Sequence, residues 1–292
     1  MTGSTGSGPA GCGSSGHSAG FVEVAAGVHV RRYPVLDVNS TLVVGEGEAL
    51  LVDTLSTDAQ AHELAAAVRA VTPYPWVVVN THHHFDHCFG NAVLAAGGRP
   101  VWGHEATAAL LAERPEALRR RWYEEWVATD PELAAGLAEV RVVPPDHTVR
   151  TTATLTVGGR TVILRHLGRG HTAGDLVVHV PDADLLIAGD LVEQSGPPSF
   201  EDAFPLEWPE ALAAMGHLLG PDSVVVPGHG AVVGRDFVRQ QHAELTALAW
   251  RIRDGHADGA PAEAVAAGAP FGPQAALTAV RRGYAELAGA TR

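Results

Sequence analysis

Residues 80–91 read NTHHHFDHCFGN and directly follow the apolar run WVVV at 76–79. The stretch places four histidines and one aspartate within six positions: His82, His83, His84, Asp86 and His87. The apolar run predicts a short buried strand, so these side chains leave the sheet on a turn and can point into one cavity from a rigid base. Imidazole and carboxylate groups are ligands that zinc and similar divalent ions accept. His83 alternates with its neighbours and is expected to face away, in a packing or hydrogen-bonding role.

Three more candidate ligands follow apolar runs later in the chain. His171 lies in GRGHTAGD, Asp190 in IAGDL and His229 in VPGHG. Glycine flanks each of them, and glycine lets the backbone turn sharply or approach a ligand closely. A single glycine-flanked histidine is usually a loop residue without a ligand. Three such positions, together with the first cluster, favour one shared metal site.

The composition indicates a large hydrophobic core and an acidic surface. Of the 292 residues, 46% are hydrophobic and 18% are charged, and the net charge is −13. This charge argues against nucleic acid as a partner, because binding the phosphate backbone requires a basic face. The one basic cluster, Arg119–Arg121, is interleaved with glutamates at helical spacing. It predicts a solvated helix face, with contact to an anion or substrate as the alternative.

The remaining composition points to a cytoplasmic protein. The two cysteines, Cys12 and Cys88, provide no framework for disulfides. Residues 1–20 are rich in Gly and Ser and lack the apolar centre of a secretory signal, so we expect a disordered tail. No stretch approaches the roughly 18 to 20 apolar residues of a membrane span. The expected partner is a small-molecule substrate, and the oligomeric state is left open.

Two similar halves follow the tail. Residues 21–35 and 40–54 are β-rich, Thr57-Asp58-Ala59-Gln60 resembles a capping box, and a helical repeat continues to Pro73. In the second half, hairpins are expected at 154–168 and 175–191, a helix at 207–219 and a strand at 223–227. The segment LVV…DLLIAGD echoes LVV…ALLVDT, with Asp190 and Asp53 each at the end of an apolar strand. The repeat predicts an α/β fold of two packed sheets with helices outside.

From about residue 235 onward the pattern is helical only. Apolar stripes occur at Val238, Leu245, Leu248 and Ile252 and again at Leu277, Val280, Tyr284 and Leu287. We therefore divide the chain into a tail (1–20), a main domain (21–235) and a C-terminal helical extension (236–292) that serves in packing.

The ordered series LLVDT, THHHFDH, GHT, GD and PGHG resembles the metallo-β-lactamase superfamily of metallohydrolases over residues 21–235. The resemblance implies an αββα sandwich of two mixed sheets, with a metal site at the edge where they meet. It implies one metal on His82, His84 and His171. It implies a second on Asp86, His87 and His229, with Asp190 bridging both. It also implies that Asp53 accepts a hydrogen bond from a ligand imidazole.

Within that superfamily the pattern is closer to the glyoxalase II-like and lactonase branches. Asp190 stands where some true β-lactamases have a thiolate, which argues against antibiotic hydrolysis as the native task. The chain departs from glyoxalase II at Gly90-Asn91, where that family has Gly-Gly. Its C-terminal helices also lack the basic glutathione-binding signature.

The resemblance implies a hydrolase with two Zn²⁺ ions, although nitrogen and oxygen ligands also suit iron or manganese. A metal-bridging hydroxide would attack an ester, thioester, lactone or amide, and Asp86 would orient it and carry a proton. The alternative is a persulfide dioxygenase with one iron on His82, His171 and Asp190. A nuclease and a non-catalytic binding protein are less favoured, because the charge is acidic and no ligand position is lost.

Two segments are expected near the substrate. Residues 195–208 are rich in Pro and Phe and are expected to wall the pocket, which suggests a partly hydrophobic substrate. Trp122, Tyr123 and Trp126 are expected mainly in core packing, with a cover over the cleft as the alternative.

Overall fold

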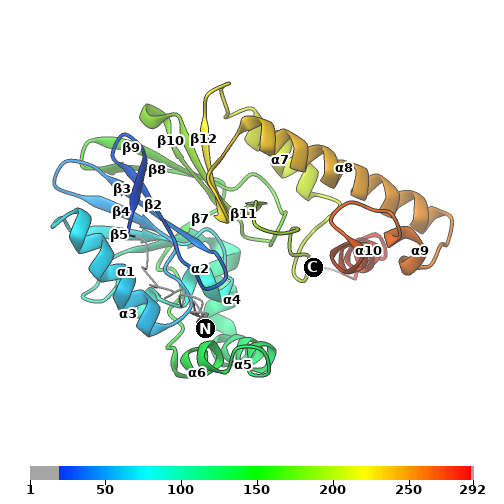
Figure 1. Cartoon of the computed structure of the whole chain (residues 1–292), viewed down its shortest axis with the longest axis horizontal. Helices are drawn as coiled ribbons and strands as arrows, with labels where there is room; N and C mark the ends of the chain where they lie inside the picture. Colours follow the sequence, from blue (N-terminus) through cyan, green and yellow to red (C-terminus); the bar gives the residue numbers. More distant parts are fainter. Residues whose placement is uncertain (1–19, 291–292) are drawn as a thin grey trace, which may run out of the picture.

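The computed structural model describes residues 20–290, so the tail expected at 1–20 lies outside the described residues except for Gly20. Two β-sheets pack face to face, and helices cover their outer faces (Figure 1). The two packed sheets with outer helices predicted from the two halves of the sequence, and the αββα sandwich that the family resemblance implies, are confirmed.

The first sheet has seven strands in chain order. They are β1 (Val22–Ala25), β2 (Val28–Arg32), β3 (Asn39–Val44), β4 (Ala49–Val52), β5 (Trp76–Val79), β6 (Val101–His104) and β7 (His147–Val149). Strands β1 to β4 run antiparallel to one another, and β4 to β7 are parallel.

The second sheet has six strands in the order β13-β12-β11-β10-β9-β8. They are β8 (Thr152–Val157), β9 (Arg160–Arg165), β10 (Val177–Val180), β11 (Leu185–Glu193), β12 (Val224–His229) and β13 (Val233–Gly234). A short 3-10 helix (Pro181–Ala183) joins β10 to β11. Strand β11 pairs parallel with β12 and antiparallel with β10, so β10-β11-β12 repeats the arrangement of β3-β4-β5.

Alternating side chains divide each sheet between two cores. In the first sheet, Val43 and Val52 face the other sheet, whereas Leu42 and Leu51 face outward. In the second sheet, Val178 and Ile187 face inward, whereas Val177 and Leu186 face outward. Both faces of each sheet are therefore buried, which explains the continuous apolar runs in the sequence.

The outer helices bury one apolar face each. Helix α1 (Asp58–Val71) packs Leu64 and Val68 on the first sheet. Helices α7 (Trp208–Gly216) and α8 (Arg235–Ala257) cover the second sheet. Helices α2 (Phe85–Cys88), α3 (Asn91–Leu94), α4 (Glu105–Glu113), α5 (Pro115–Trp126) and α6 (Pro131–Glu139) form the excursion between β5 and β7.

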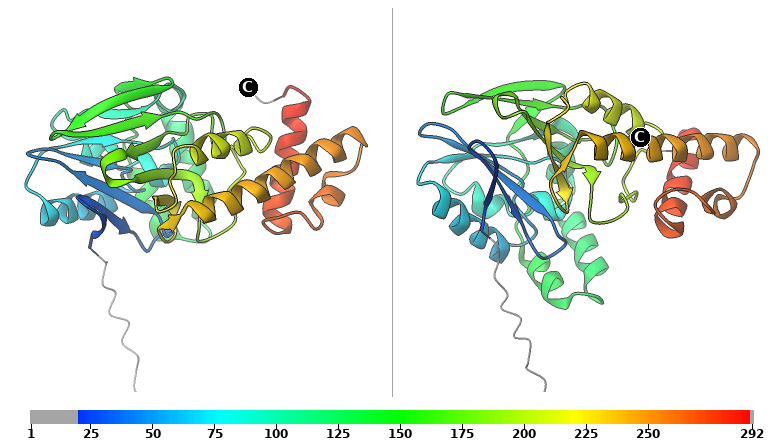
Figure 2. Two further views of the ribbon diagram at one scale, coloured as in Figure 1. Left: turned by 90° about the horizontal axis from the view of Figure 1, so that it is seen from above. Right: turned by 45° about the horizontal axis from the view of Figure 1, so that its top comes forward.

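Helix α8 extends away from the sandwich, and α9 (Ala262–Ala266) and α10 (Pro273–Leu287) pack against it (Figure 2). The stripes expected on α8 and α10 supply most of this contact, since Ile252 of α8 and Val280 of α10 are both fully buried, but Leu287 at the end of α10 is exposed. Within residues 20–290, no helix combines the length and the apolar character that crossing a membrane requires.

Local expectations differ from the structure at a few points. Thr57 caps α1 by accepting from Gln60 N, but the Gln60 side chain accepts from Ser56 N instead of completing the box at Thr57. Strands β6 and β7 were not predicted, because each is only three or four residues long and neither alternates clearly. Their pairing with β5 is long-range and leaves no local signature.

The docking of α10 depends on pH through Glu286. Its carboxyl accepts from Leu206 N at 3.5 Å, and burial together with Glu207 raises its pKa from 4.5 to about 7. The folded state therefore holds this proton more tightly than the unfolded state. The resulting stabilisation is present below pH 4.5 and is lost as pH rises through about 7.

We expect the Glu286→Gln variant to remove this contribution, because the amide stays neutral. Urea unfolding at pH 4.5 and at pH 8 should show that the wild type loses more free energy of unfolding than the variant across this interval. Glu263→Gln is the matched control, since the pKa of Glu263 is already lowered by its backbone and Arg281. Parallel pH curves for wild type and Glu286→Gln would contradict the assignment.

Candidate metal centre

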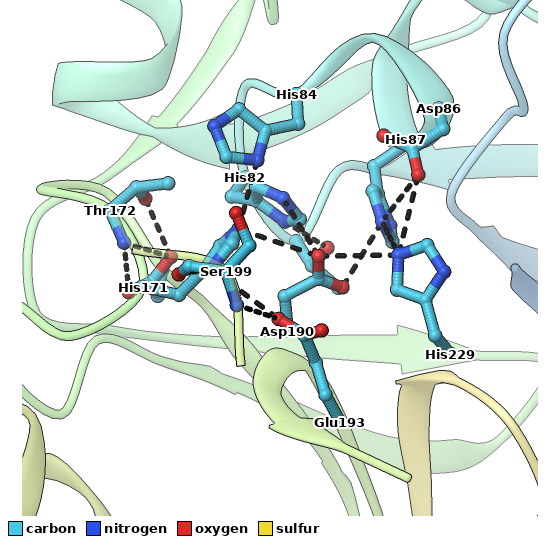
Figure 3. A network of polar contacts seen from close by, with 12 residues as sticks. His82, His84, Asp86, His87, His171, Thr172, Asp190, Glu193, Ser199 and His229 are labelled. Carbon is cyan, nitrogen blue, oxygen red and sulfur yellow. Dashed lines mark hydrogen bonds and ion pairs between the residues drawn. The ribbon is translucent and has the colours of Figure 1, made fainter. Parts of the chain in front are cut away.

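The candidate ligands meet where the carboxyl ends of the parallel strands reach the same edge of the sandwich. His82 and His84 follow β5, and Asp86 and His87 lie in α2. His171 comes from the β9–β10 loop, Asp190 from β11 and His229 from the end of β12. Figure 3 shows all seven side chains around one centre, with Asp190 in the middle. The structure thus brings together every ligand proposed from the sequence.

Three histidines and Asp190 form the first group. The Nδ1 atom of His84 lies 2.8 Å from Nε2 of His171, and the Asp190 Oδ2 atom lies 3.4 Å from that same Nε2. His82 Nε2 is 3.7 Å from Asp190 Oδ2. The four ligand atoms lie within 4.8 Å of one another, which is close enough for a single ion.

Asp86, His87 and His229 form the second group. His229 Nε2 is 3.3 Å from both Asp86 Oδ2 and His87 Nε2. The Asp190 carboxylate also reaches this group, at 3.1 Å from His87 Nε2 and 3.3 Å from His229 Nε2. The Asp190 carboxylate is therefore in contact with both groups.

Each of the five imidazoles uses one ring nitrogen on an outer partner and turns the other inward. The outer pairs are His82 Nδ1 with Thr81 Oγ1, His84 Nε2 with Asp202 Oδ2, His87 Nδ1 with Asp53 Oδ2, His171 Nδ1 with the Ser199 carbonyl and His229 Nδ1 with the Leu36 carbonyl. The inward Nε2 of His82 is buried and has no hydrogen-bond partner. Because inward nitrogens face one another across short distances, the residues present fit a bound cation.

Asp53 holds the second group to the first sheet. Its Oδ1 atom accepts from Thr81 N and its Oδ2 atom accepts from Thr81 Oγ1, at 2.8 Å each, and His87 Nδ1 lies 2.8 Å from the same Oδ2. The residue has φ +64°, a left-handed conformation that aspartate tolerates better than most residues. Burial raises the pKa of Asp53, and His87 opposes that rise.

Asp202 is a site residue that the sequence analysis missed. Its Oδ2 atom lies 3.1 Å from His84 Nε2 and 3.5 Å from His83 Nε2 and accepts from Arg121 at 3.0 Å. Arg121 therefore does not belong wholly to a solvated helix face, although Arg120 does. His83 lies outside both ligand groups and contacts the same carboxylate. Despite burial, His83, His84 and Arg121 hold the pKa of Asp202 well below its usual range.

The two groups differ in their proton affinity. Burial lowers the pKa of His84 to about 4 and that of His171 to about 3, and it also holds the pKa of His82 low. Burial acts in the same direction on His229, but Asp190 and Asp86 raise its pKa to about 10. The first group thus presents neutral imidazoles at neutral pH, whereas the carboxylates around the second attract positive charge.

A cavity of about 300 Å³ opens onto these groups. Leu36, Phe85, Trp122 and Trp126 form its apolar wall, so Trp122 and Trp126 do cover the cleft while Tyr123 lies elsewhere. The segment 195–208 also lines the pocket, but through polar or small residues: Ser195, Gly196, Ser199 and Glu201. Its Phe200 and Phe204 are buried away from the pocket, because they pack in the core and against arginines. The prediction that this segment supplies an apolar wall of the pocket was therefore wrong.

Comparison with known proteins identifies the family and supports the fold. The family model described as the metallo-beta-lactamase superfamily matches residues 33–229. A type 2 metallo-beta-lactamase of Bacteroides fragilis is 25% identical over 72% of this chain and 75% of its own length. A hydroxyacylglutathione hydrolase of Brucella anthropi is 23% identical over 67% of this chain and 66% of its own length. The solved metallo-beta-lactamase from Pontibacter korlensis has a TM-score of 0.63 and 24% identity, and covers 77% of this chain and 98% of that one.

Gly228 leaves the space that Asp190 occupies. A Cβ atom at position 228 would lie 1.7 Å from Asp190 Oδ1 and 2.9 Å from the Asp190 backbone nitrogen. We expect the added methyl group of Gly228→Ala to displace this carboxylate. Metal binding should weaken by about tenfold or more, which is the usual effect of disturbing a residue that supports a metal site. Metal content after dialysis against a graded chelator measures the effect.

Gly216→Ala is the matched control, because a Cβ atom there meets nothing within 4 Å. If Gly228→Ala and Gly216→Ala retained metal equally, the position of the Asp190 carboxylate would not depend on the absence of a Cβ atom at Gly228.

Proposed function

The chain belongs to the metallo-beta-lactamase superfamily, and from this premise we propose that it is a dinuclear, zinc-dependent hydrolase of small esters, thioesters, lactones or amides. The observation that carries the proposal is the shared Asp190 carboxylate, which lies between two sets of inward-facing ligand atoms. Two groups joined by one carboxylate suit a pair of cations better than a single one.

His82, His84 and His171 would hold the first ion, and Asp86, His87 and His229 the second, with Asp190 contacting both. When bound, such a pair supplies Lewis acidity, which polarises an electrophilic carbonyl and acidifies water. The chain itself keeps the ligand nitrogens unprotonated and orients the imidazole rings. Burial lowers the pKa of His84 and of His171, so both rings stay neutral. The hydrogen bonds of their outer ring nitrogens fix the orientation of the two rings.

Asp86 is the proposed proton carrier. It lines the pocket, and its Oδ2 atom lies 3.3 Å from His229 Nε2 and 3.6 Å from His87 Nε2. From that position its carboxylate can orient an attacking water and pass the proton to the leaving group. Trp122 and Phe85 form an apolar wall beside it, which limits access of bulk water.

The charges around the pocket favour a substrate without negative charge. Glu125 and Glu201 line it, whereas burial and Asp190 raise the pKa of Glu193 to about 8, so that this carboxyl is largely neutral at pH 7. A carboxylate-bearing substrate would meet the like charges of Glu125 and Glu201, whereas a neutral lactone, ester or amide would not. This supports the lactonase-like reading over a glutathione thioester.

The metal content separates this proposal from a mononuclear iron dioxygenase on His82, His171 and Asp190. We expect about two zinc ions per chain, and turnover within a panel of lactones, thioesters and β-lactams that stops on chelation and returns with zinc. Asp190→Ala should lose metal and turnover together, while Asp236→Ala, whose side chain is 98% exposed, should lose neither. One iron per chain with oxygen uptake would decide for the dioxygenase.

A second variant tests the role of Asp86. We expect Asp86→Asn to lower kcat by about 10² to 10⁴, because the amide cannot accept a proton. The first ligand group is untouched by this change, so at least one ion should remain by elemental analysis. A variant with full kcat would show that Asp86 carries no proton in the reaction.

A further inference from the structure

A second cavity, of about 410 Å³, lies behind the metal centre and shares no lining residue with the substrate pocket. Three arginines line it: Arg114 and Arg121, at the start of α5 and within it, and Arg282 on α10. Asp202 and His83 form its side toward the metal ligands. The C-terminal helix α10 thus contributes a cation to a cavity of the main domain.

The positive charge in this cavity exceeds what the cavity's own carboxylate can neutralise. Arg121 pairs with Asp202, which also contacts His83 and His84. Among the residues that the structure describes, neither Arg114 nor Arg282 forms an ion pair. Arg282 donates its Nε to the Ala203 carbonyl at 3.0 Å, and its guanidinium lies 5.8 Å from the centre of the Phe204 ring. Three guanidinium groups therefore face one carboxylate, in a chain whose net charge is −13.

Guanidinium groups that line one cavity give it a positive potential, which attracts an anion. Their planar forks match the oxygens of a phosphoryl group, and a dianionic phosphate can engage more of them than a single carboxylate can. Leu110, Leu118 and Phe204 line the remaining wall and offer an apolar surface to an organic substituent. The volume lies within the range of small-molecule sites, about 300 to 1,000 Å³.

We propose that this arginine cavity binds a small phosphate monoester. The site is separate from the metal centre, so the bound phosphate is a ligand and not the hydrolysed group. This inference does not depend on the proposed hydrolase function, because it rests on Arg114, Arg282 and the cavity they line.

The test uses the metal-loaded full chain and titrates inorganic phosphate and methyl phosphate by calorimetry at constant ionic strength, with chloride as the balancing anion. Arg114→Gln removes a guanidinium that has no ion pair among residues 20–290, so the variant should fold. We expect it to weaken phosphate binding by about tenfold or more, since a charge-assisted hydrogen bond is lost. Arg282→Lys keeps the positive charge and should bind phosphate more weakly than wild type but better than an Arg114→Gln/Arg282→Gln double variant.

Arg281→Gln is the control, because Arg281 neighbours Arg282 on α10 but pairs with Glu263 on the surface. It should bind phosphate like wild type. Phosphate can also bind to the metal ions of the loaded chain. That binding would be the same in Arg114→Gln as in the wild type, so a loss of affinity in this variant reports on the arginine cavity. Unchanged phosphate affinity in Arg114→Gln, or equal heats from chloride and phosphate, would overturn the proposal, whatever the metal content and the hydrolytic activity prove to be.

Discussion

The buried carboxylate of Asp190 is the feature on which the rest of this site depends. Only 5% of its side chain is exposed, and an unpaired charge at such a depth is strongly unfavourable. His82 and His171 from one side and His87 and His229 from the other surround it. Burial raises its pKa, but these imidazoles hold it well below the usual range. Its charge thus ties together segments more than a hundred residues apart.

The backbone is arranged to bring this carboxylate to that point. Gly189 adopts φ +55° directly before it, and Gly228 packs on it with no Cβ atom in between. The two sheets are also joined at this edge, where Val38 bridges to His229 and Asn39 donates to the carbonyls of Pro227 and Gly230. The contact that closes the sandwich therefore also positions the last ligand, so fold and site cannot vary independently here.

The sequence predicted the sheets and the candidate ligands because both carry local signals. Apolar runs predicted strands such as β5 and β12, and several candidate ligands stand at or soon after such strands: His82 and His84 follow β5, and His229 ends β12. Asp202 and Arg121 carried no such signal. Asp202 lies in an irregular segment, and its relation to His84 exists only through packing across 118 positions of sequence. Likewise, Phe200 and Phe204 predicted an apolar pocket wall, but composition does not determine which side of an irregular segment faces inward.

Asp202 also marks the boundary between two regions of opposite charge. On one side, Glu125 and Glu201 line the pocket that opens to the candidate metal ligands. On the other side, arginines from α5 and α10 line a separate cavity. Because Arg121 and His84 share the Asp202 carboxylate, an anion that competes for Arg121 alters the partner that orients His84. The carboxylate that contacts His84 is thus shared with Arg121, a cation of the second cavity, which connects α5 physically to the candidate metal centre.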